Sequence, residues 1–355
     1  MMRSNNYKKY RDVEDQIKYL EIHKKIIVED DNKKLFLERN YIELINPYKE
    51  LIYQGKTATG KHIYKEDVYF SSIKSLVEID DWICQNLFIL IRRFEKRFRN
   101  TITLILSDKY SQPGKYCSNY GITYIDDIQD VIKEGDKDYS ESVIAPNINV
   151  TLSKEGKFIS DNPNRIISKA DLLAKIKIIG TCKDQRDYKT NGPINNAILS
   201  QKTAPFWLVT SALNFGDLQR LFELQDSKTM KKIYRQTLDI NDDVEVSNKD
   251  IFKFLGKIET VRKMRNTVNH YLPIFPLLLD QIPKKVQESQ ILATIKMLKS
   301  IKDSSLMKTD SENLDYLAFI GSLEDNTFGI KITNYNKKKF EMVKAVVDLI
   351  IQTKE

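Results

Sequence analysis

The chain has 355 residues, of which 41% are hydrophobic and 30% charged, and its formal net charge is +8 at pH 7. These values describe a globular protein that can bury a sizeable core as one large or two modest domains. No apolar run approaches the roughly 18 residues that a membrane-spanning helix needs, and the polar segment 1–25 lacks the apolar region of a secretion signal. We therefore expect a cytoplasmic protein that avoids membranes and whose basic charge favours a polyanionic partner.

Cysteine and histidine are both scarce. The chain contains three of each: Cys84, Cys117, Cys182, His23, His62 and His270. The cysteines are odd in number and widely spaced, which predicts reduced thiols and not a disulfide framework. Structural zinc sites need four clustered nitrogen or sulfur ligands, so we expect no metal site, and nothing in the sequence indicates a cofactor.

Short helices are predicted over residues 1–35 and 35–53, where apolar residues recur among charged ones. The next segment, Gly55-Lys56-Thr57-Ala58-Thr59-Gly60-Lys61-His62, nearly matches a phosphate-binding loop. His62 stands where that loop needs a Ser or Thr to bind magnesium, and the flanking sequence does not show the expected strand and helix. We interpret the segment as a polar turn.

The longest helical pattern runs from Ser72 to Ser107, with apolar residues three or four positions apart. Five cations lie on and beside the opposite face: Arg92, Arg93, Lys96, Arg97 and Arg99. Only one acid, Glu95, accompanies them. The sequence leaves two interpretations open, a solvated basic face and a surface that contacts RNA phosphates.

The predicted architecture is mainly α. A helical domain spans residues 1–280 and contains an irregular insertion at about 108–202, rich in Gly, Asn, Asp, Ser and Pro. Within the insertion, Ile144 to Phe158 is compatible with a short hairpin. Residues 281–355 predict a small C-terminal appendage of helices, and two short strands within Leu317 to Ile332 would make it α+β.

A last long helix is predicted from Ile251 onward, with an N-terminal cap at Ser247 and an end before Pro273. Its apolar residues form one broad arc, yet Arg265 falls inside that arc. Along the border of the arc lie four further polar residues: Arg262, Asn266, Asn269 and His270. An arginine between helices is unfavourable unless it is paired or binds an anion, so this segment is the sharpest chemical signal in the sequence.

The same pattern occurs earlier in the chain. Phe98-Arg99-Asn100-Thr101-Ile102 and Met264-Arg265-Asn266-Thr267-Val268 both read apolar-Arg-Asn-Thr-apolar within a predicted helix. Coincidence is an alternative for a match of five residues. The two segments differ in the residues that come after them, because Leu104 and Ile105 stand where the later segment leads to His270 and Tyr271.

Arg265 and His270 form an Arg-x4-His arrangement that resembles the signature of the HEPN superfamily, whose members include metal-independent ribonucleases. Four segments in order also resemble the bacterial abortive-infection (Abi) proteins of the AbiD/AbiF kind. They are Asn40-Tyr41-Ile42-Glu43-Leu44-Ile45, the helix from Ile79-Asp80-Asp81-Trp82 through Arg99 to Lys109-Tyr110, Phe206-Trp207 through Leu213-Asn214-Phe215-Gly216-Asp217-Leu218, and Val261 to His270. Together they cover roughly residues 35–275.

The resemblance implies a HEPN-like helical bundle that cleaves RNA, as a toxin of phage defence. His270 would act as general base on a ribose 2′-hydroxyl or as general acid on the leaving 5′-oxygen. Arg265 would hold the scissile phosphate, and Asn266, one helical turn from His270, would orient it or a phosphate oxygen. From their charge, we also expect the five basic residues of the earlier helix, together with Arg262, to contact RNA.

Two positions depart from the family pattern. Tyr271 stands where members often carry a second histidine, and Ile105 stands where many carry a histidine on the earlier helix. One histidine serves one proton transfer, so a second catalytic group is needed. We expect a homodimer that pairs two copies of His270; an intrachain pairing in which Arg99 helps is the alternative.

Other interpretations stay open. Arg262 and Arg265 would be structural if they paired with acids such as Glu78 or Asp81, with His270 capping the helix. The chain would then be a catalytically silent RNA-binding module, regulated by a structured RNA, or a structural component of a defence complex. A restraining partner, protein or RNA, is compatible with each.

Overall fold

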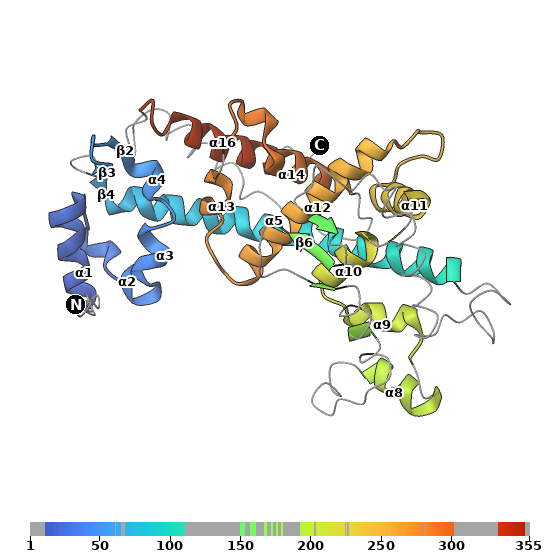
Figure 1. Cartoon of the computed structure of the whole chain (residues 1–355). Coiled ribbons are helices and arrows are strands. Elements are labelled where there is room, and N and C mark those ends of the chain that lie inside the picture. The colour runs from blue at the N-terminus through green and yellow to red at the C-terminus, as the bar shows by residue number, and fades with distance from the viewer. Residues whose placement is uncertain are drawn as a thin grey trace, which may run out of the picture. The chain divides into compact units, whose positions relative to one another are not determined.

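A computed structural model describes residues 11–60, 62–64, 68–110, 192–201, 204–223, 225, 227–280, 282–301 and 333–351, with the strands 150–152, 157–160 and 167–168 and residues 172, 175, 176 and 179 (Figure 1). The predicted class is confirmed, because the described chain is mainly α-helical. None of these helices combines the length and the apolar character needed to cross a membrane.

Short elements precede the first long helix. They are α1 (Val13–Tyr19), the π-helix η1 (Leu20–Lys24), β1 (Ile26–Ile27), the 3-10 helix η2 (Asp30–Asn32), α2 (Leu35–Glu38), α3 (Tyr41–Ile45), α4 (Lys49–Ile52), β2 (Tyr53–Lys56), β3 (His62–Tyr64) and β4 (Val68–Tyr69). Strands β1 and β4 pair in parallel, and β2 and β3 pair in antiparallel orientation. The segment that resembles a phosphate-binding loop is therefore a hairpin, and the predicted turn at its tip is confirmed, with Gly60 at φ 79°.

Later elements follow a 41-residue helix, α5 (Phe70–Tyr110). They are β5 (Val150–Leu152), β6 (Lys157–Ser160), β7 (Ile167–Ser168), α8 (Gly192–Gln201), α9 (Phe206–Ala212), α10 (Phe215–Glu223), α11 (Ser227–Leu238), α12 (Asn248–Asn269), α13 (Phe275–Leu279), the 3-10 helix η4 (Val286–Glu288), α14 (Gln290–Ser300) and α16 (Lys337–Ile351). Strands β5 and β6 are antiparallel, which confirms the hairpin predicted in this part of the insertion. Most of the predicted insertion, Cys117, Cys182 and the predicted strands within 317–332 lie outside the described residues.

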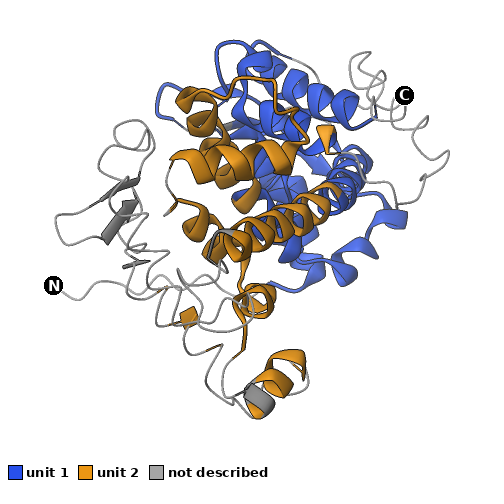
Figure 2. Cartoon of the chain, turned by 90° about the vertical axis from the view of Figure 1, so that its right-hand side faces the viewer, with its two compact units in different colours: residues 1–89, 263–299, 304–355 blue, residues 90–262, 300–303 orange. Residues whose placement is uncertain are grey.

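The chain divides into two compact units (Figure 2). Unit 1 comprises residues 1–89, 263–299 and 304–355, and unit 2 comprises residues 90–262 and 300–303. Both α5 and α12 therefore contribute to both units. Helices α14 and α16, predicted as an appendage, cluster with the N-terminal segment in unit 1; the boundary predicted at residue 280 stays a prediction, as does the HEPN-like bundle.

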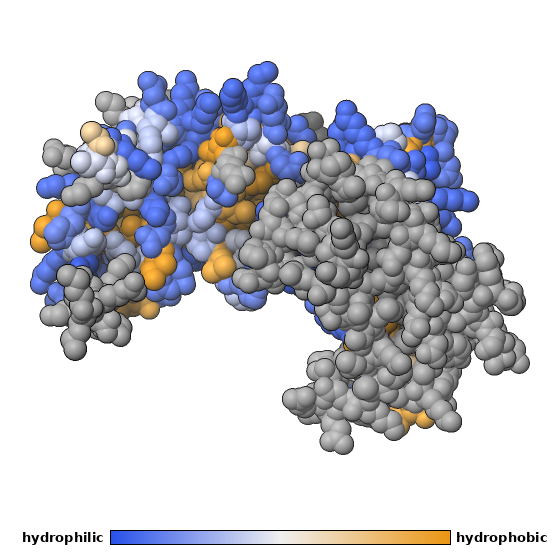
Figure 3. Space-filling model, viewed as in Figure 1, coloured by the Kyte–Doolittle hydropathy of each residue, from blue (hydrophilic) through white to orange (hydrophobic). Residues whose placement is uncertain are grey.

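Unit 1 is joined by contacts between its N-terminal and C-terminal parts. The side-chain amide of Asn336, just before α16, donates to the Leu51 carbonyl at 2.8 Å, and Lys339 pairs with Glu50 at 2.5 Å. The Tyr48 ring packs edge-on against Phe275 at 5.4 Å. Several large apolar or aromatic side chains of the N-terminal part stay exposed: Ile22, Ile27, Leu37, Ile42, Ile63 and Tyr69. Figure 3 shows hydrophobic surface, in orange, among the hydrophilic surface on this side of the view.

Unit 2 is built around an aromatic core. Five rings from α5, α10 and α12 have centroids 5.4–6.3 Å apart: Phe94, Phe98, Phe215, Phe222 and Phe254. All five side chains are fully buried or nearly so. Tilted and edge-on ring pairs of this kind add to the free energy gained from burial, so the second half of α5 is firmly placed within its unit.

Candidate functional site

Helix α12 begins with the predicted N-terminal cap. The Ser247 hydroxyl accepts from the Asp250 amide at 3.3 Å, and the Asp250 carboxylate accepts from the Ser247 amide at 3.0 Å and from its hydroxyl at 2.6 Å. These hydrogen bonds lower the pKa of Asp250. The reciprocal pair satisfies amide groups that the helix start leaves without an intrahelical acceptor.

The apolar arc predicted for α12 is buried, with one exception. Buried residues recur along the helix at Ile251, Phe254, Leu255, Ile258, Val261, Met264 and Val268. Arg265 is half-buried beside this arc, whereas Asn266 and His270 are exposed. Leu272, which we expected in the arc, is 52% exposed because the helix has already ended before it.

The end of α12 is a Schellman turn. The Tyr271 amide donates to the Val268 carbonyl at 3.2 Å, and the Leu272 amide donates to the Thr267 carbonyl at 3.0 Å. Tyr271 has φ 54°, the left-handed conformation that this turn requires and that glycine usually supplies. His270 thus occupies the last position before the chain leaves the helix, with its amide on the Asn266 carbonyl at 3.2 Å.

The turn after His270 is held by α5. Both oxygens of the Asp80 carboxylate accept backbone amides, from Ile274 at 2.7 Å and from Phe275 at 3.2 Å. The Cys84 sulfur lies 3.5 Å from Asp80 Oδ1 and 3.9 Å from the Leu272 carbonyl oxygen, so its one proton bonds to either. Burial raises the pKa of Asp80 to about 6, although the two amides act in the opposite direction.

Asp80 is a residue that the sequence patterns did not single out. It is 1% exposed and lies on the buried stripe of α5, four residues after Leu76 and three before Ile83. A carboxylate at such a position needs hydrogen-bond donors. An acid among the apolar residues of a predicted helix was therefore a signal that could have identified Asp80. The sequence pattern did not indicate which groups donate to it.

The basic residues of α5 fall into two groups. Arg92 and Lys96 are exposed and Arg93 is half-buried. Arg97 donates to the Gln236 carbonyl at 3.2 Å and pairs with Asp239 at 3.2 Å, at the end of α11. Contact of any of these residues with RNA stays a prediction.

Arg99 and Arg262 bind groups within unit 2. Arg99 Nη1 donates to the carbonyls of Thr210 at 2.5 Å and Leu213 at 2.7 Å, and its Nη2 pairs with Glu95 at 3.2 Å. These carbonyls lie at the C-terminal end of α9, where few backbone amides remain to bind them; the Thr210 carbonyl also accepts the Leu213 amide at 3.3 Å. Arg262 pairs with Glu259, one turn earlier on α12, with Nε 2.7 Å from Oε2.

The alternative in which Asp81 pairs with Arg262 or Arg265 gains no support from these contacts. Asp81 pairs with Arg39, with Nη2 2.5 Å from Oδ2 and Nη1 3.2 Å from Oδ1.

Within the described residues, no group of three or more His, Cys, Asp or Glu side chains is positioned to hold a metal ion.

The family described as Abi-like protein matches residues 34–276. The chain belongs to the Abi-like family. This match associates the chain with abortive infection and confirms the Abi resemblance drawn from its four segments. No curated protein and no solved structure matches it significantly. The residues matched in this Abi-like protein include Asp80, the whole of α12 and the turn that Asp80 holds.

Proposed function

We propose that this Abi-like protein is a HEPN-type endoribonuclease, a cytoplasmic toxin of phage defence, whose active site is the end of α12. The observation that supports the proposal is the presentation of His270. Its side chain is exposed, one turn after the exposed Asn266 and five residues after the half-buried Arg265, on a turn that Asp80 holds in place.

The proposed reaction is attack of a ribose 2′-hydroxyl on the adjacent phosphorus. A bond forms between the 2′-oxygen and phosphorus, and the bond from phosphorus to the 5′-oxygen breaks. The base takes the 2′-hydroxyl proton, and the acid gives a proton to the leaving 5′-oxygen. The products are a 2′,3′-cyclic phosphate end and a 5′-hydroxyl end.

Each site residue has a role in this reaction. His270 transfers one of the two protons, and the Arg265 guanidinium binds the scissile phosphate and offsets the charge that develops on it. Asn266 orients His270 or a phosphate oxygen. The second proton transfer needs another group, and we propose that a homodimer supplies it as a second copy of His270. The chemistry assigned to these residues requires no metal ion.

The test is incubation of purified protein with bulk RNA in EDTA, followed by mapping of the product ends. His270→Ala is expected to lower the cleavage rate about 100- to 10,000-fold, as loss of a general acid or base does. His23→Ala is the matched control, because His23 is also exposed in unit 1 but lies on η1. Full activity of the His270→Ala protein would refute the proposal.

The second copy of the site is tested by concentration. If the active species is a homodimer, the cleavage rate per chain rises with protein concentration until all chains are in dimers. A DNA strand of the same sequence is expected to stay uncut in either case, because it lacks the 2′-hydroxyl. A rate per chain that is constant down to the concentration where sedimentation shows monomers would refute the dimer.

A catalytically silent RNA-binding protein is the second candidate, supported by the exposed positions of Arg92 and Lys96 on α5. It predicts RNA binding that weakens steeply with salt and produces no new ends. Arg92→Ala combined with Lys96→Ala would then weaken binding, whereas His270→Ala would not.

A further inference from the structure

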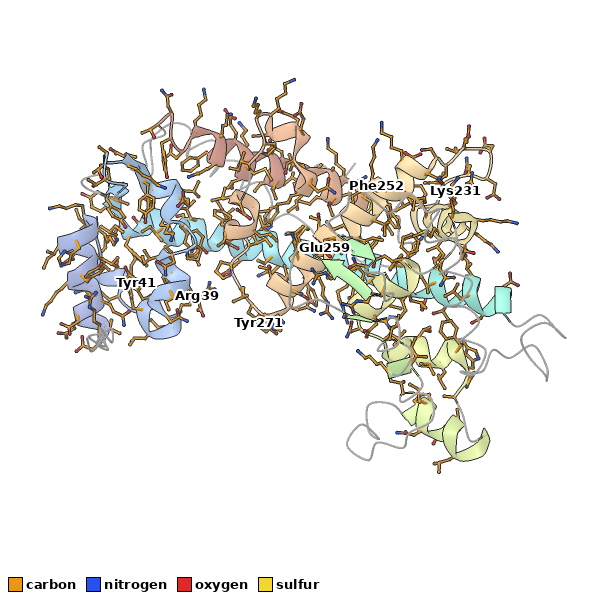
Figure 4. All side chains as sticks on the ribbon, viewed as in Figure 1. Arg39, Tyr41, Lys231, Phe252, Glu259 and Tyr271 are labelled. Carbon is orange, nitrogen blue, oxygen red and sulfur yellow. The ribbon has the colours of Figure 1, made fainter. Side chains whose placement is uncertain are left out.

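The exposed ring of Tyr271 is the feature that the reaction leaves unexplained. Tyr271 is 94% exposed, the largest fraction among the exposed large apolar and aromatic side chains that the structure describes; Leu37 is next at 76%. Figure 4 shows its side chain projecting away from the end of α12. Within the single chain such a ring gains nothing from burial, so packing against the rest of the described chain does not account for a tyrosine at this position.

The backbone does not account for it either. At φ 54° an L side chain is crowded and glycine is favoured, so tyrosine is a poor residue for this turn. Within the described chain, two other non-glycine residues have positive φ, Lys25 and Asp239, and both also follow helix ends. Those two are charged residues, and Asp239 pairs with Arg97, whereas Tyr271 places an aromatic ring in water. An outlier that neither packing nor backbone explains points to function.

The backbone next to the ring is also anchored. The amides of Ile274 and Phe275 are bound to Asp80, and the Leu272 carbonyl oxygen lies 3.9 Å from the Cys84 sulfur. Two hydrogen bonds to Asp80 of α5 therefore anchor the backbone that follows Tyr271. A ligand that uses the ring does not have to order the loop first, which favours binding.

We propose that Tyr271 stacks on a nucleobase of the RNA beside the phosphate that His270 and Arg265 act on. This inference rests on the proposed function, because it places RNA at the end of α12. Exposed aromatic rings are the usual platform for unpaired bases, and stacking accepts every base because each has a π face. Tyr271 is adjacent to His270 in the chain, so a base stacked on it belongs to a nucleotide at the scissile bond.

The experiment measures binding without cleavage. The His270→Ala protein is titrated into a short single-stranded RNA that carries a fluorescent label, and then into the same RNA with 2-aminopurine, whose fluorescence falls when it stacks. When the His270→Ala protein also carries Tyr271→Gly, RNA binding is expected to weaken about 5- to 150-fold and the fluorescence decrease to disappear. When it carries Tyr271→Phe instead, it is expected to keep both the binding and the fluorescence decrease, because the aromatic ring is retained.

Two controls separate stacking from a structural role. Tyr271→Gly suits the left-handed backbone, so its melting temperature is expected to equal or exceed that of the parent protein. Tyr69→Ala removes another exposed tyrosine of unit 1, on β4, and is expected to bind within about two-fold of the parent. Equal binding by the Tyr271→Gly protein, quenching that survives the change, or no binding of either RNA by the parent would each overturn the inference.

The inference and the proposed function fail in different ways. If His270 is required for cleavage and Tyr271→Gly leaves KM and binding unchanged, the nuclease stands and the stacking role falls. If no cleavage depends on His270 and binding still depends on the Tyr271 ring, the nuclease falls and the ring remains an RNA contact. If both stand, Tyr271→Gly raises KM more than it lowers kcat.

Discussion

The two apolar-Arg-Asn-Thr-apolar segments are alike in sequence and differ in what the structure does with them. Arg99, in unit 2, lies in the interior of the 41-residue helix α5 and donates to the carbonyls that end α9. Arg265, in unit 1, lies four residues before the end of α12, so that His270 and Tyr271 emerge on an exposed turn. The same five-residue pattern therefore supplies a structural arginine where the helix continues. Where the helix stops, the pattern is followed by exposed side chains.

The largest expected effect separates the two arginines by activity. Arg265→Ala is expected to lower RNA cleavage about 100- to 1000-fold, since a group that stabilises developing phosphate charge contributes on that scale. The measurement is the initial rate on bulk RNA, with circular dichroism to show that the fold is kept. Lys263→Ala, an exposed cation two residues earlier, is the control and is expected to stay within about two-fold.

The next prediction is that Arg99 contributes to the stability of the fold. Arg99→Ala leaves the Glu95 carboxylate, whose side chain is 8% exposed, without this partner and removes one hydrogen bond from each of the Thr210 and Leu213 carbonyls. We expect the free energy of unfolding to fall by about 3 kcal/mol, the range for breaking a buried ion pair. Chemical denaturation checks it, with the exposed neighbour Lys96→Ala expected to change it by less than about 0.5 kcal/mol. Equal stability of the two variants would contradict the structural role of Arg99.

The turn after the second segment predicts a pH effect. Burial raises the pKa of Asp80 from 3.8 to about 6, so the folded chain holds this proton more tightly than the unfolded chain. That contribution to stability is present below about pH 4 and is lost as pH rises through about 6. With about 1.4 kcal/mol for each pKa unit, the loss is roughly 3 kcal/mol at most.

Asp80→Asn isolates this contribution, because asparagine does not titrate. The difference in unfolding free energy between the natural chain and the Asp80→Asn chain is measured by denaturation at several pH values. As pH rises from about 4 to 7, the natural chain is expected to lose stability relative to the Asp80→Asn chain. A difference in unfolding free energy that stays constant across that window would contradict the assignment.

The smallest effect is expected at the exposed ion pair of unit 1. The side chains of Arg39 and Asp81 are 37% and 42% exposed, so solvent screens their attraction. Arg39→Ala is expected to lower the free energy of unfolding by less than about 1 kcal/mol. Comparison with Arg99→Ala under the same conditions shows how much burial matters for an arginine that pairs with an acid.

Local patterns predicted much of this fold. The helical class, the cap at Ser247, the hairpin turn at Gly60 and the buried arc of α12 all follow from residues close together in the chain. The half-buried position of Arg265 follows from the same periodicity. Each depends on hydrogen bonds or spacing within a few residues, which a single sequence records.

Long-range partners could not be predicted in this way. Arg99 donates to Thr210, 111 residues later, and Asp80 accepts from Ile274, 194 residues later. Periodicity shows which face of a helix is buried but not which carbonyl or amide meets it. The exposed position of Leu272 was missed for a different reason, since a tyrosine in the left-handed turn is uncommon and the helix was expected to run on.

The 194 residues between Asp80 and Ile274 also matter for how the chain is made. The amides that Asp80 binds emerge from the ribosome only after the residues between them have followed Asp80. A nascent chain that stops before residue 275 has no anchored turn at His270 and Tyr271. For a protein proposed to cut RNA, this means that the anchored turn cannot form until Ile274 and Phe275 have been made.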